Sequence, residues 1–185
     1  AERFHDVTSG RITVDGVDVR DVSQHALRSQ LGYVPQAAFL FSGTIASNVG
    51  YGVDGAAEDR IRAAADVAQA SEFIAERPEG LATPISQGGT NVSGGQRQRL
   101  AIARALATDA RAYLFDDSFS ALDYKTDAAL RHELSCRLGG KTVVIVAQRI
   151  STVLNADQIV VLDDGRVVGR GTHEQLMESC QEYRG

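Results

Sequence analysis

The sequence is poor in several residue types, and each shortage excludes a class of protein. Its 185 residues include 2 cysteines, 3 prolines and no tryptophan. Two cysteines cannot build the disulfide framework of a small secreted domain. The longest apolar runs, such as residues 142–147, are far too short to cross a bilayer, which takes about 20 residues. We therefore expect any membrane role to come through a partner or through a segment outside this sequence.

Positive charge is also in short supply. The 19 Lys and Arg residues are outnumbered by 24 Asp and Glu residues, which gives a formal net charge of −5. A nucleic-acid-binding domain normally has a basic face, so we expect no nucleic-acid partner. The remaining composition, 43% hydrophobic and 23% charged, is typical of a globular domain that is long enough to bury a core.

Predicted strands and helices alternate along the sequence. The continuous apolar run at 142–146 predicts a strand buried on both faces, and further strands are expected at 31–34 and 112–116. Thr172 and Gln175 form a capping box for a last helix, which would place His173 on the surface of its first turn. Hairpins are predicted at 10–19 and 158–171, and helices at 23–30, 44–49, 58–69, 71–76, 93–107 and 123–138.

This order of elements predicts an α/β fold with a largely parallel sheet. The stretch from about 40 to 106 is rich in helices and lacks predicted strands, which indicates an α-helical subdomain inserted into the sheet domain. We therefore expect one domain over residues 1–185, with the helical subdomain at about 40–106 and the α/β core at 1–39 and 107–185.

Two pattern matches lack the order of strands and helices that their motifs require. Residues 50–55 satisfy the dinucleotide pattern G-x-G-x-x-G, but a predicted helix precedes them where a strand is required. Residues 135–142 resemble a P-loop, but Ser135 replaces the first glycine and the order is helix, loop, strand. We interpret the first match as a turn between helices, and Lys141 in the second as a surface charge.

The sequence also contains one possible pair of metal-ligand residues, which we do not interpret as a metal site. His132 and Cys136 lie one helical turn apart, but two ligands without a second pair do not make a structural metal site. We interpret both as ordinary helix residues.

An acidic pair ends the strand predicted at 112–116. Asp116 and Asp117 would lie at the carboxyl edge of a parallel sheet, where the ligands of such folds bind. Asp116 suits a water-mediated contact to Mg²⁺, and Asp117 suits a base or water-orienting group. A solvated strand end without function is the alternative interpretation.

Residues 92–99, Val-Ser-Gly-Gly-Gln-Arg-Gln-Arg, open a predicted helix with residues suited to phosphate. Ser93 can cap the helix, and Gly94 and Gly95 let a ligand approach the amides at its positive end. Gln96 adds a side-chain amide. A cap alone does not explain two successive glycines in the first turn, because glycine disfavours a helix. The stretch therefore predicts a phosphate contact.

Together these motifs resemble the nucleotide-binding domain of an ATP-binding cassette (ABC) exporter. The resemblance covers essentially the whole chain, and the motifs follow the family order. They are the Q-loop Gln36 in YVPQ, the signature VSGGQ (92–96), the Walker B strand AYLFDD (112–117), the D-loop SALD (120–123) and the switch region IVAQR (145–149). Exporter-like segments also occur at 39–52, at 83–91, which resembles the X-loop, and at 162–177.

The resemblance implies a RecA-like, P-loop-NTPase-type core that binds ATP and Mg²⁺. It implies that Asp116 and Gln36 hold Mg²⁺ and that Asp123 of the D-loop contacts nucleotide. In the family, two domains sandwich two ATP molecules head to tail, so the signature would contact the ATP of a second ABC domain. The residues assigned to that contact are Ser93, Gly94, Gly95 and Gln96.

The family pattern also implies a location. Transmembrane domains would dock on the surface formed by the Q-loop and the X-loop. This would hold the chain at the cytoplasmic face of the plasma (inner) membrane, as part of an ATPase that drives export.

The sequence departs from the family pattern in three places. The Walker A P-loop, the aromatic A-loop and the first strands are not in this sequence, so we expect a partial domain that is inactive alone. Asp117 occupies the position of a catalytic Glu; its carboxylate is about 1.5 Å shorter in reach, and a misplacement of about 1 Å can cost on the order of 100-fold in rate. Gln148 occupies the switch His position, and Gln cannot carry a positive charge.

Both altered residues are hydrolytic positions, whereas Gln36, Asp116, Asp123 and the signature match the family. By resemblance, we expect the degenerate-site half of a heterodimeric exporter, which completes the competent ATP site of its partner. Two alternatives stay open: a non-hydrolytic interaction module that docks on an intact ABC domain, and a soluble ABC ATPase acting in DNA maintenance or translation. The exporter-like segments and the net charge disfavour the last.

Overall fold

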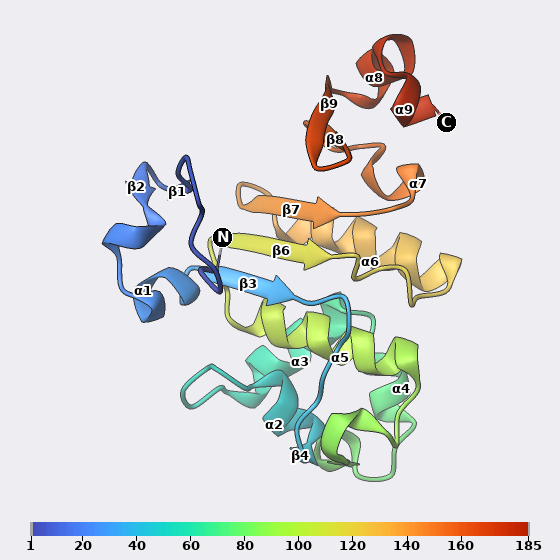
Figure 1. Cartoon of the computed structure of the whole chain (residues 1–185). Helices are drawn as coiled ribbons and strands as arrows, with labels where there is room; N and C mark the ends of the chain where they lie inside the picture. Colours follow the sequence, from blue (N-terminus) through green and yellow to red (C-terminus); the bar gives the residue numbers. More distant parts are fainter. Residues whose placement is uncertain (1, 185) are drawn as a thin grey trace. The chain divides into compact units, whose positions relative to one another are not determined.

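The computed structural model describes residues 2–184, which divide into two compact units (Figure 1). The N-terminal unit ends at Val144, and the C-terminal unit begins at Ile145.

Parallel strands form the centre of the N-terminal unit. β3 (Leu31–Val34) and β6 (Ala112–Asp116) pair in parallel, with Leu31 opposite Ala112 and Val34 opposite Phe115. Their arrows point the same way in Figure 1, so the residues that follow each strand share one edge of the sheet. β7 (Thr142–Val146) extends the sheet in the order β3-β6-β7. The predicted α/β architecture is confirmed.

The predicted burial of β7 on both faces is wrong. Val143, Val144 and Val146 are 38%, 47% and 56% exposed. β7 stands at one end of the order β3-β6-β7, so among the described strands it has a neighbour on one side only. An apolar, β-branched run predicts the strand itself, but its burial depends on what covers the two faces.

Helix α5 (Gly94–Ala107) lies in the core of this unit. It packs against α2 (Ile45–Val49), α3 (Glu58–Val67) and strand β3. Neighbours on several sides bury more of the helix than the one apolar face of a typical surface helix, and the small alanines allow close approach. Its buried apolar residues are Leu100, Ala101, Ile102, Ala103, Ala105 and Ala107.

The remaining elements of this unit are short, except for α6 (Tyr124–Arg137). The predicted hairpin at 10–19 is confirmed: its strands join at Asp15 and Gly16, both with positive φ. The others are β1 (Thr13–Val14), β2 (Val17–Asp18), the 3₁₀ helix η1 (Val19–Asp21), α1 (Gln24–Arg28), β4 (Gly43–Thr44), α4 (Ser71–Ala75), η2 (Gly80–Ala82), β5 (Pro84–Ile85) and η3 (Gln87–Gly89).

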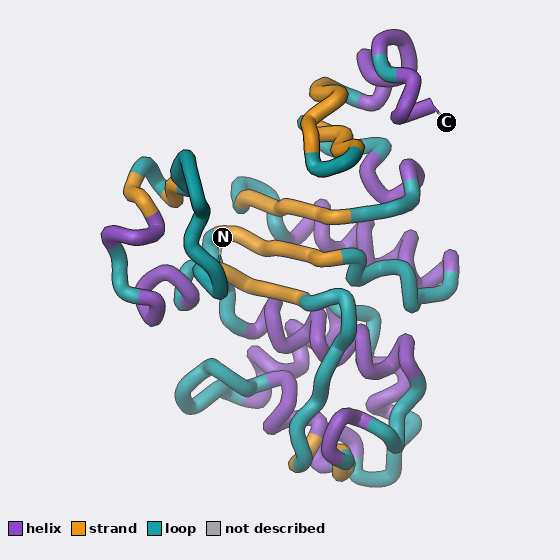
Figure 2. The backbone as a smooth tube through the Cα atoms, viewed as in Figure 1, coloured by secondary structure: helices purple, strands orange, loops and turns teal. Residues whose placement is uncertain are grey.

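The region from 40 to 106 is mostly helix and loop (Figure 2). We expected no strand there, but β4 and β5 pair antiparallel through Gly43–Ile85 and Thr44–Pro84. The two-residue length of each strand explains why periodicity does not reveal them. The boundaries of a helical subdomain at about 40–106 stay a prediction.

Both rejected motifs lie between the secondary-structure elements that the sequence predicted around them. Residues 50–55 lie between α2 and α3, and residues 138–141 connect helix α6 to strand β7. Lys141, however, is more than a surface charge. It forms an ion pair with Asp109 and donates to the Ala110 carbonyl oxygen at 2.9 Å.

The C-terminal unit is built on the second predicted hairpin. β8 (Ile159–Asp163) and β9 (Arg166–Gly171) pair antiparallel around Asp164 and Gly165, which have φ values of 44° and 73°. The helices are α7 (Ile150–Val153), α8 (His173–Ser179) and α9 (Gln181–Arg184). A small core of its own consists of Ile159, Leu176, Cys180 and Tyr183.

The start of α8 confirms one prediction and corrects another. Thr172 and Gln175 form the predicted capping box. His173 is half-buried instead of lying free on the surface, and its Nδ1 atom is 2.9 Å from the Tyr183 hydroxyl. The packing of α9 onto α8 accounts for this contact, and the sequence patterns did not predict α9.

Candidate functional site

Carboxylate, amide and phenol groups meet where β3 and β6 end. Asp116 closes β6, and the Tyr33 hydroxyl donates to its Oδ2 atom at 3.5 Å. Gln36 lies two residues beyond β3, and its Nε2 atom donates to Asp117 Oδ2 at 3.4 Å. The structure thus brings three of the predicted residues, Gln36, Asp116 and Asp117, to one edge of the sheet.

Ser118 fixes this edge and was not predicted. Its side chain is fully buried, and its hydroxyl donates to the Val34 carbonyl oxygen at 3.0 Å and to that of Asp116 at 3.3 Å. It therefore ties the end of β6 to the end of β3. A small hydroxyl residue directly after an acidic pair is the sequence feature that could have indicated it.

The backbone at Asp117 turns sharply. Its φ of 42° is in the left-handed region, which is uncommon for any residue other than glycine, although Asp tolerates it better than most. The Ser120 hydroxyl donates to the Asp117 carbonyl oxygen at 2.9 Å and holds this turn. Asp117 is thus presented from a backbone that is fixed on both sides.

The oxygen donors at this edge suit Mg²⁺. Gln36, Asp116 and Asp117 offer amide and carboxylate oxygens, which are the hard ligands that Mg²⁺ prefers. Within residues 2–184, no cluster of three or more His, Cys, Asp and Glu residues could hold a metal ion by itself. The donor set fits a cation that takes its other ligands from water and from phosphate, as Mg²⁺ does when it binds with a nucleotide.

The residues assigned to the predicted phosphate contact form a second group, at the N-terminus of α5. Ser93 Oγ accepts the Gln96 N–H at 3.2 Å, and Gln96 Oε1 accepts the Ser93 N–H at 3.1 Å. This capping box aligns the first turn and leaves Ser93 and Gly94 exposed. A Cβ atom placed on Gly94 would meet nothing within 4 Å. The positive end of a 14-residue helix is therefore open to an anion.

The predicted D-loop lies against this helix end. A Cβ atom on Gly95 would be 3.5 Å from the Ala121 carbonyl oxygen, so the small residue permits the close approach. Asp123 caps α6 by accepting hydrogen bonds from Thr126 Oγ1 at 2.7 Å and from the Thr126 N–H at 3.0 Å. These bonds lower the pKa of Asp123, the side-chain bond most of all, and keep it ionised.

Gln148 lies in the C-terminal unit, between β7 and α7, and is exposed. Its predicted role as the residue of the switch position stays a prediction.

A cluster around Arg104 was also not predicted. Its guanidinium donates to the Asn48 carbonyl oxygen and to Asn48 Oδ1, both at 2.8 Å, and to the Phe39 carbonyl oxygen at 3.0 Å. It also lies 5.3 Å from the centre of the Phe41 ring and 5.8 Å from that of Tyr51. We call Phe39, Phe41 and Tyr51 the aromatic cluster; its members are 46%, 37% and 57% exposed.

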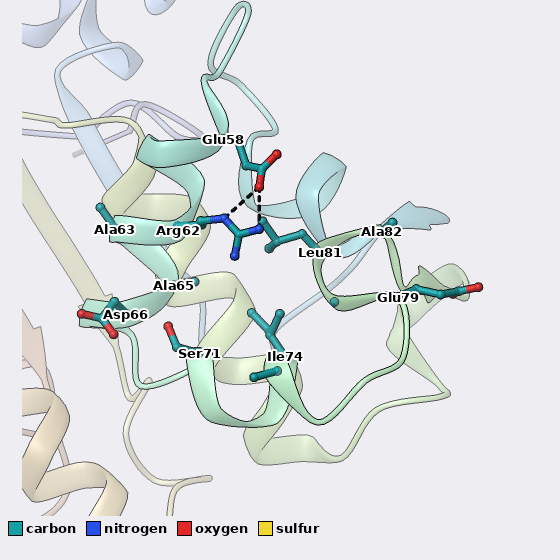
Figure 3. A pocket seen from close by; sticks show the side chains of 12 residues that line it. Glu58, Arg62, Ala63, Ala65, Asp66, Ser71, Ile74, Glu79, Leu81 and Ala82 are labelled. Atoms are coloured by element: carbon teal, nitrogen blue, oxygen red, sulfur yellow. Dashed lines mark hydrogen bonds and ion pairs between the residues drawn. The ribbon is translucent and has the colours of Figure 1, made fainter.

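A pocket of about 670 Å³ lies between α3, α4 and η2 (Figure 3). Ile74 and Leu81 line it beside polar groups such as Ser71. Arg62 reaches it but is paired with Glu58 at 2.5 Å. None of the predicted site residues lines this pocket, and its cation is already neutralised, so we assign it no part in phosphate binding.

Comparisons with known proteins agree with this arrangement. A family profile described as ABC transporter matches residues 2–120. The chain is 47% identical over 184 residues to an ABC transporter ATP-binding protein of Mycobacterium bovis, covering 98% of this chain and 31% of that protein. It is 43% identical over 182 residues to the ATP-dependent lipid A-core flippase of Desulfotalea psychrophila, with coverage of 98% and 32%.

A solved structure extends the similarity to three dimensions. The structure of a bacterial Atm1-family ABC exporter with ATP bound matches this chain with a TM-score of 0.96 at 40% sequence identity. The match covers 99% of this chain and 32% of that chain. The fold is therefore that of the nucleotide-binding domain of an ABC exporter, consistent with a RecA-like core.

The chain belongs to the ABC transporter family and has the fold of its ATP-binding domain. It spans about a third of the length of the relatives named above. Within residues 2–184, no helix combines the length and the hydrophobicity needed to cross a membrane.

Proposed function

We propose that this chain is the ATP-binding domain of an exporter and couples ATP binding and hydrolysis to the transport of a substrate across a membrane. The observation that carries the proposal is the open N-terminus of α5, where an intact capping box aligns exposed backbone amides and the space at Gly94 is clear. An ABC exporter with ATP bound shares this fold at 40% identity, which supports ATP as the ligand.

The phosphate at this helix end belongs to the ATP of a second ABC domain. The signature lies against the D-loop at Gly95 and Ala121, whereas Asp116 ends β6 and Gln36 follows β3. In a head-to-tail pair, each ATP would contact Asp116 and Gln36 of one domain and residues 93–96 of the other. The amides and the helix dipole would then stabilise charge on the transferring phosphoryl group.

Gln36, Asp116 and Asp117 would each have a role toward Mg²⁺ or the nucleotide. Asp116 and the Gln36 amide oxygen would hold Mg²⁺, which when bound neutralises phosphate charge. Asp117 would orient the attacking water. Its carboxylate lacks one methylene relative to Glu, and the bonds of Ser118 and Ser120 fix its backbone, so a shift of the chain does not restore the lost reach. We expect slow hydrolysis at this site, and Gln148 in place of His slows it further.

The partner with the competent site is then a non-identical ABC domain. This chain supplies its signature to that partner, and the paired domain performs most of the hydrolysis.

The aromatic cluster supports docking to transmembrane domains. The Gly88 N–H donates to the Leu40 carbonyl oxygen at 2.8 Å, and the Ser42 N–H donates to Gln87 Oε1 at 3.1 Å. The X-loop and the segment that follows the Q-loop therefore form one surface. The exposed aromatic rings lie on this surface. Exposed aromatic side chains are typical anchors of protein interfaces. The chain would thus lie at the cytoplasmic face of the membrane, attached to the transporter.

The proposal is tested by Gly94→Asp in the assembled transporter. The aspartate fits within this chain, because the space at Gly94 is open and a helix N-terminus favours an acid. It would nevertheless repel the phosphate of the partner's ATP. We expect loss of ATPase activity with an unchanged melting temperature. Gly139→Asp is the matched control, because Gly139 is also unobstructed and lies far along the chain from the signature, at the end of α6.

The complementary variant is Asp117→Ala, which should change the ATPase activity of the pair little. If Asp117→Ala silenced the pair, the degenerate-site proposal would be lost. If Gly94→Asp left the ATPase activity intact, the signature would not contact a nucleotide. A stable complex without any ATPase activity would favour an interaction module instead.

A further inference from the structure

Tyr33 is a residue of the sheet edge to which the proposed function gives no role. It lies on β3, and its hydroxyl is the hydrogen-bond donor that the structure places at Asp116 Oδ2, at 3.5 Å. The register explains the contact. Tyr33 is opposite Leu114, and Asp116 follows two residues later on the same face of β6. A phenol on the neighbouring strand can therefore reach the carboxylate along one face of the sheet.

The Tyr33 ring also contacts an aromatic neighbour near the N-terminus. The Phe4 ring meets it edge-on, with 6.3 Å between the ring centres, and the Arg28 guanidinium lies 5.2 Å from the centre of the Phe4 ring. Arg28 also donates to the Glu2 carbonyl oxygen at 3.2 Å, which anchors the segment that bears Phe4. These contacts support the Tyr33 ring in the position from which its hydroxyl reaches Asp116.

We propose that Tyr33 is a positioning residue for Asp116, which holds the carboxylate by one oxygen so that the other stays directed toward Mg²⁺. The inference rests on the proposed function, since Asp116 is a metal residue only if the site takes Mg²⁺ and ATP. A contact of 3.5 Å is longer than the usual O–H···O distance of about 2.7–2.8 Å. Such bonds are often long without the ligand and shorten in the complex.

Positioning groups of this kind affect metal affinity because they restrict the rotation of the ligand. Their loss typically weakens metal binding by about 10–100-fold. Tyr33 contacts only one oxygen, and at long range, so we expect an effect near the lower limit, about tenfold. A tyrosine that merely filled space would show no such effect when only its hydroxyl is removed.

The experiment measures labelling of the polypeptide that contains this domain by a photoreactive ATP analogue, in the assembled transporter, as Mg²⁺ is titrated. In Tyr33→Phe, we expect the Mg²⁺ concentration for half-maximal labelling to rise about tenfold, with labelling in excess EDTA unchanged. Tyr113→Phe is the matched control. Tyr113 lies on β6 but on the face opposite Asp116. The Mg²⁺ concentration for half-maximal labelling of Tyr113→Phe should therefore equal that of the wild type.

A second measurement tests whether Tyr33 acts through Asp116. In an Asp116→Asn background, adding Tyr33→Phe should cause no further shift in the Mg²⁺ midpoint. An additional tenfold shift in that background would overturn the inference. So would a wild-type midpoint in Tyr33→Phe, or equal shifts in Tyr33→Phe and Tyr113→Phe.

The two proposals fail in different ways. A wild-type transporter that takes no label at any Mg²⁺ concentration would overturn the proposed function and this inference together. A labelled, Mg²⁺-dependent wild type with an unaffected Tyr33→Phe variant would overturn this inference alone.

Discussion

Ser93 combines a structural role with a proposed ligand contact. Its hydroxyl caps α5, and its exposed position places it where we expect the partner's ATP. The two roles make different demands, because capping needs only an acceptor oxygen, whereas a phosphate contact also needs a side chain without negative charge.

Two substitutions of Ser93 should separate these roles. Asp is as good an N-cap as Ser, so Ser93→Asp should keep the free energy of unfolding near the wild-type value, but its charge should abolish the ATPase activity of the assembled pair. Ser93→Ala should lower the free energy of unfolding by about 1 kcal/mol. Urea unfolding and a steady-state ATPase assay measure the two effects. Full activity in Ser93→Asp would contradict the proposed contact.

At this scale, the sequence predicted residues whose role follows from neighbours along the chain. The cap at Ser93 and the hairpin at 158–171 depend on contacts and turns between residues close in the chain. Ser118 and Tyr33 were missed because their partners, Val34 and Asp116, are more than 80 residues away in sequence. No short-range pattern contains such contacts.

Arg104 is the clearest example of a residue that joins elements. It projects from α5 and satisfies backbone carbonyl groups at both ends of the segment from Phe39 to Asn48. Burial lowers the pKa of Arg104, which nevertheless stays charged at any pH at which the protein is folded. Asn48 is itself 1% exposed and shares its Oδ1 atom with Arg104.

We expect Arg104→Met to lower the free energy of unfolding by about 2–3 kcal/mol. The substitution keeps an apolar stem but removes three hydrogen bonds, of which the two to Asn48 are partly buried, and each such loss costs on the order of 1 kcal/mol. Urea denaturation measures the change. Arg62→Met is the control, because the exposed Glu58–Arg62 pair should contribute less than about 1 kcal/mol. Equal losses in the two variants would show that Arg104 has no special role in joining α2 to α5.

Elements with a long or regular pattern were predicted well. The periodicity of 93–107 and the apolar run of 112–116 correspond to α5 and β6. β4 and β5 were missed because each depends on pairing across about 40 residues. The burial of β7 was wrong because it depends on neighbouring elements and not on the composition of the strand.

At the scale of the whole molecule, the chain consists of two compact units, each with its own apolar core. Leu27 and Leu31 belong to a core cluster of the N-terminal unit, and Leu176 and Tyr183 to that of the C-terminal unit. The sequence predicted the family of the chain, because several motifs occur in one order over nearly its full length. It could not predict which residues of the proposed second domain would complete each ATP site, because those residues lie outside this sequence.

The central claim is that hydrolysis takes place mainly at the site whose signature comes from this chain and whose Walker motifs come from the partner. Trapping a photoreactive ATP analogue with vanadate in the assembled transporter, followed by separation of the polypeptides, tests it most directly. The account predicts that the partner takes up most of the trapped label and the polypeptide containing this chain little. Equal labelling of both polypeptides, or a pair made of two identical copies, would contradict it.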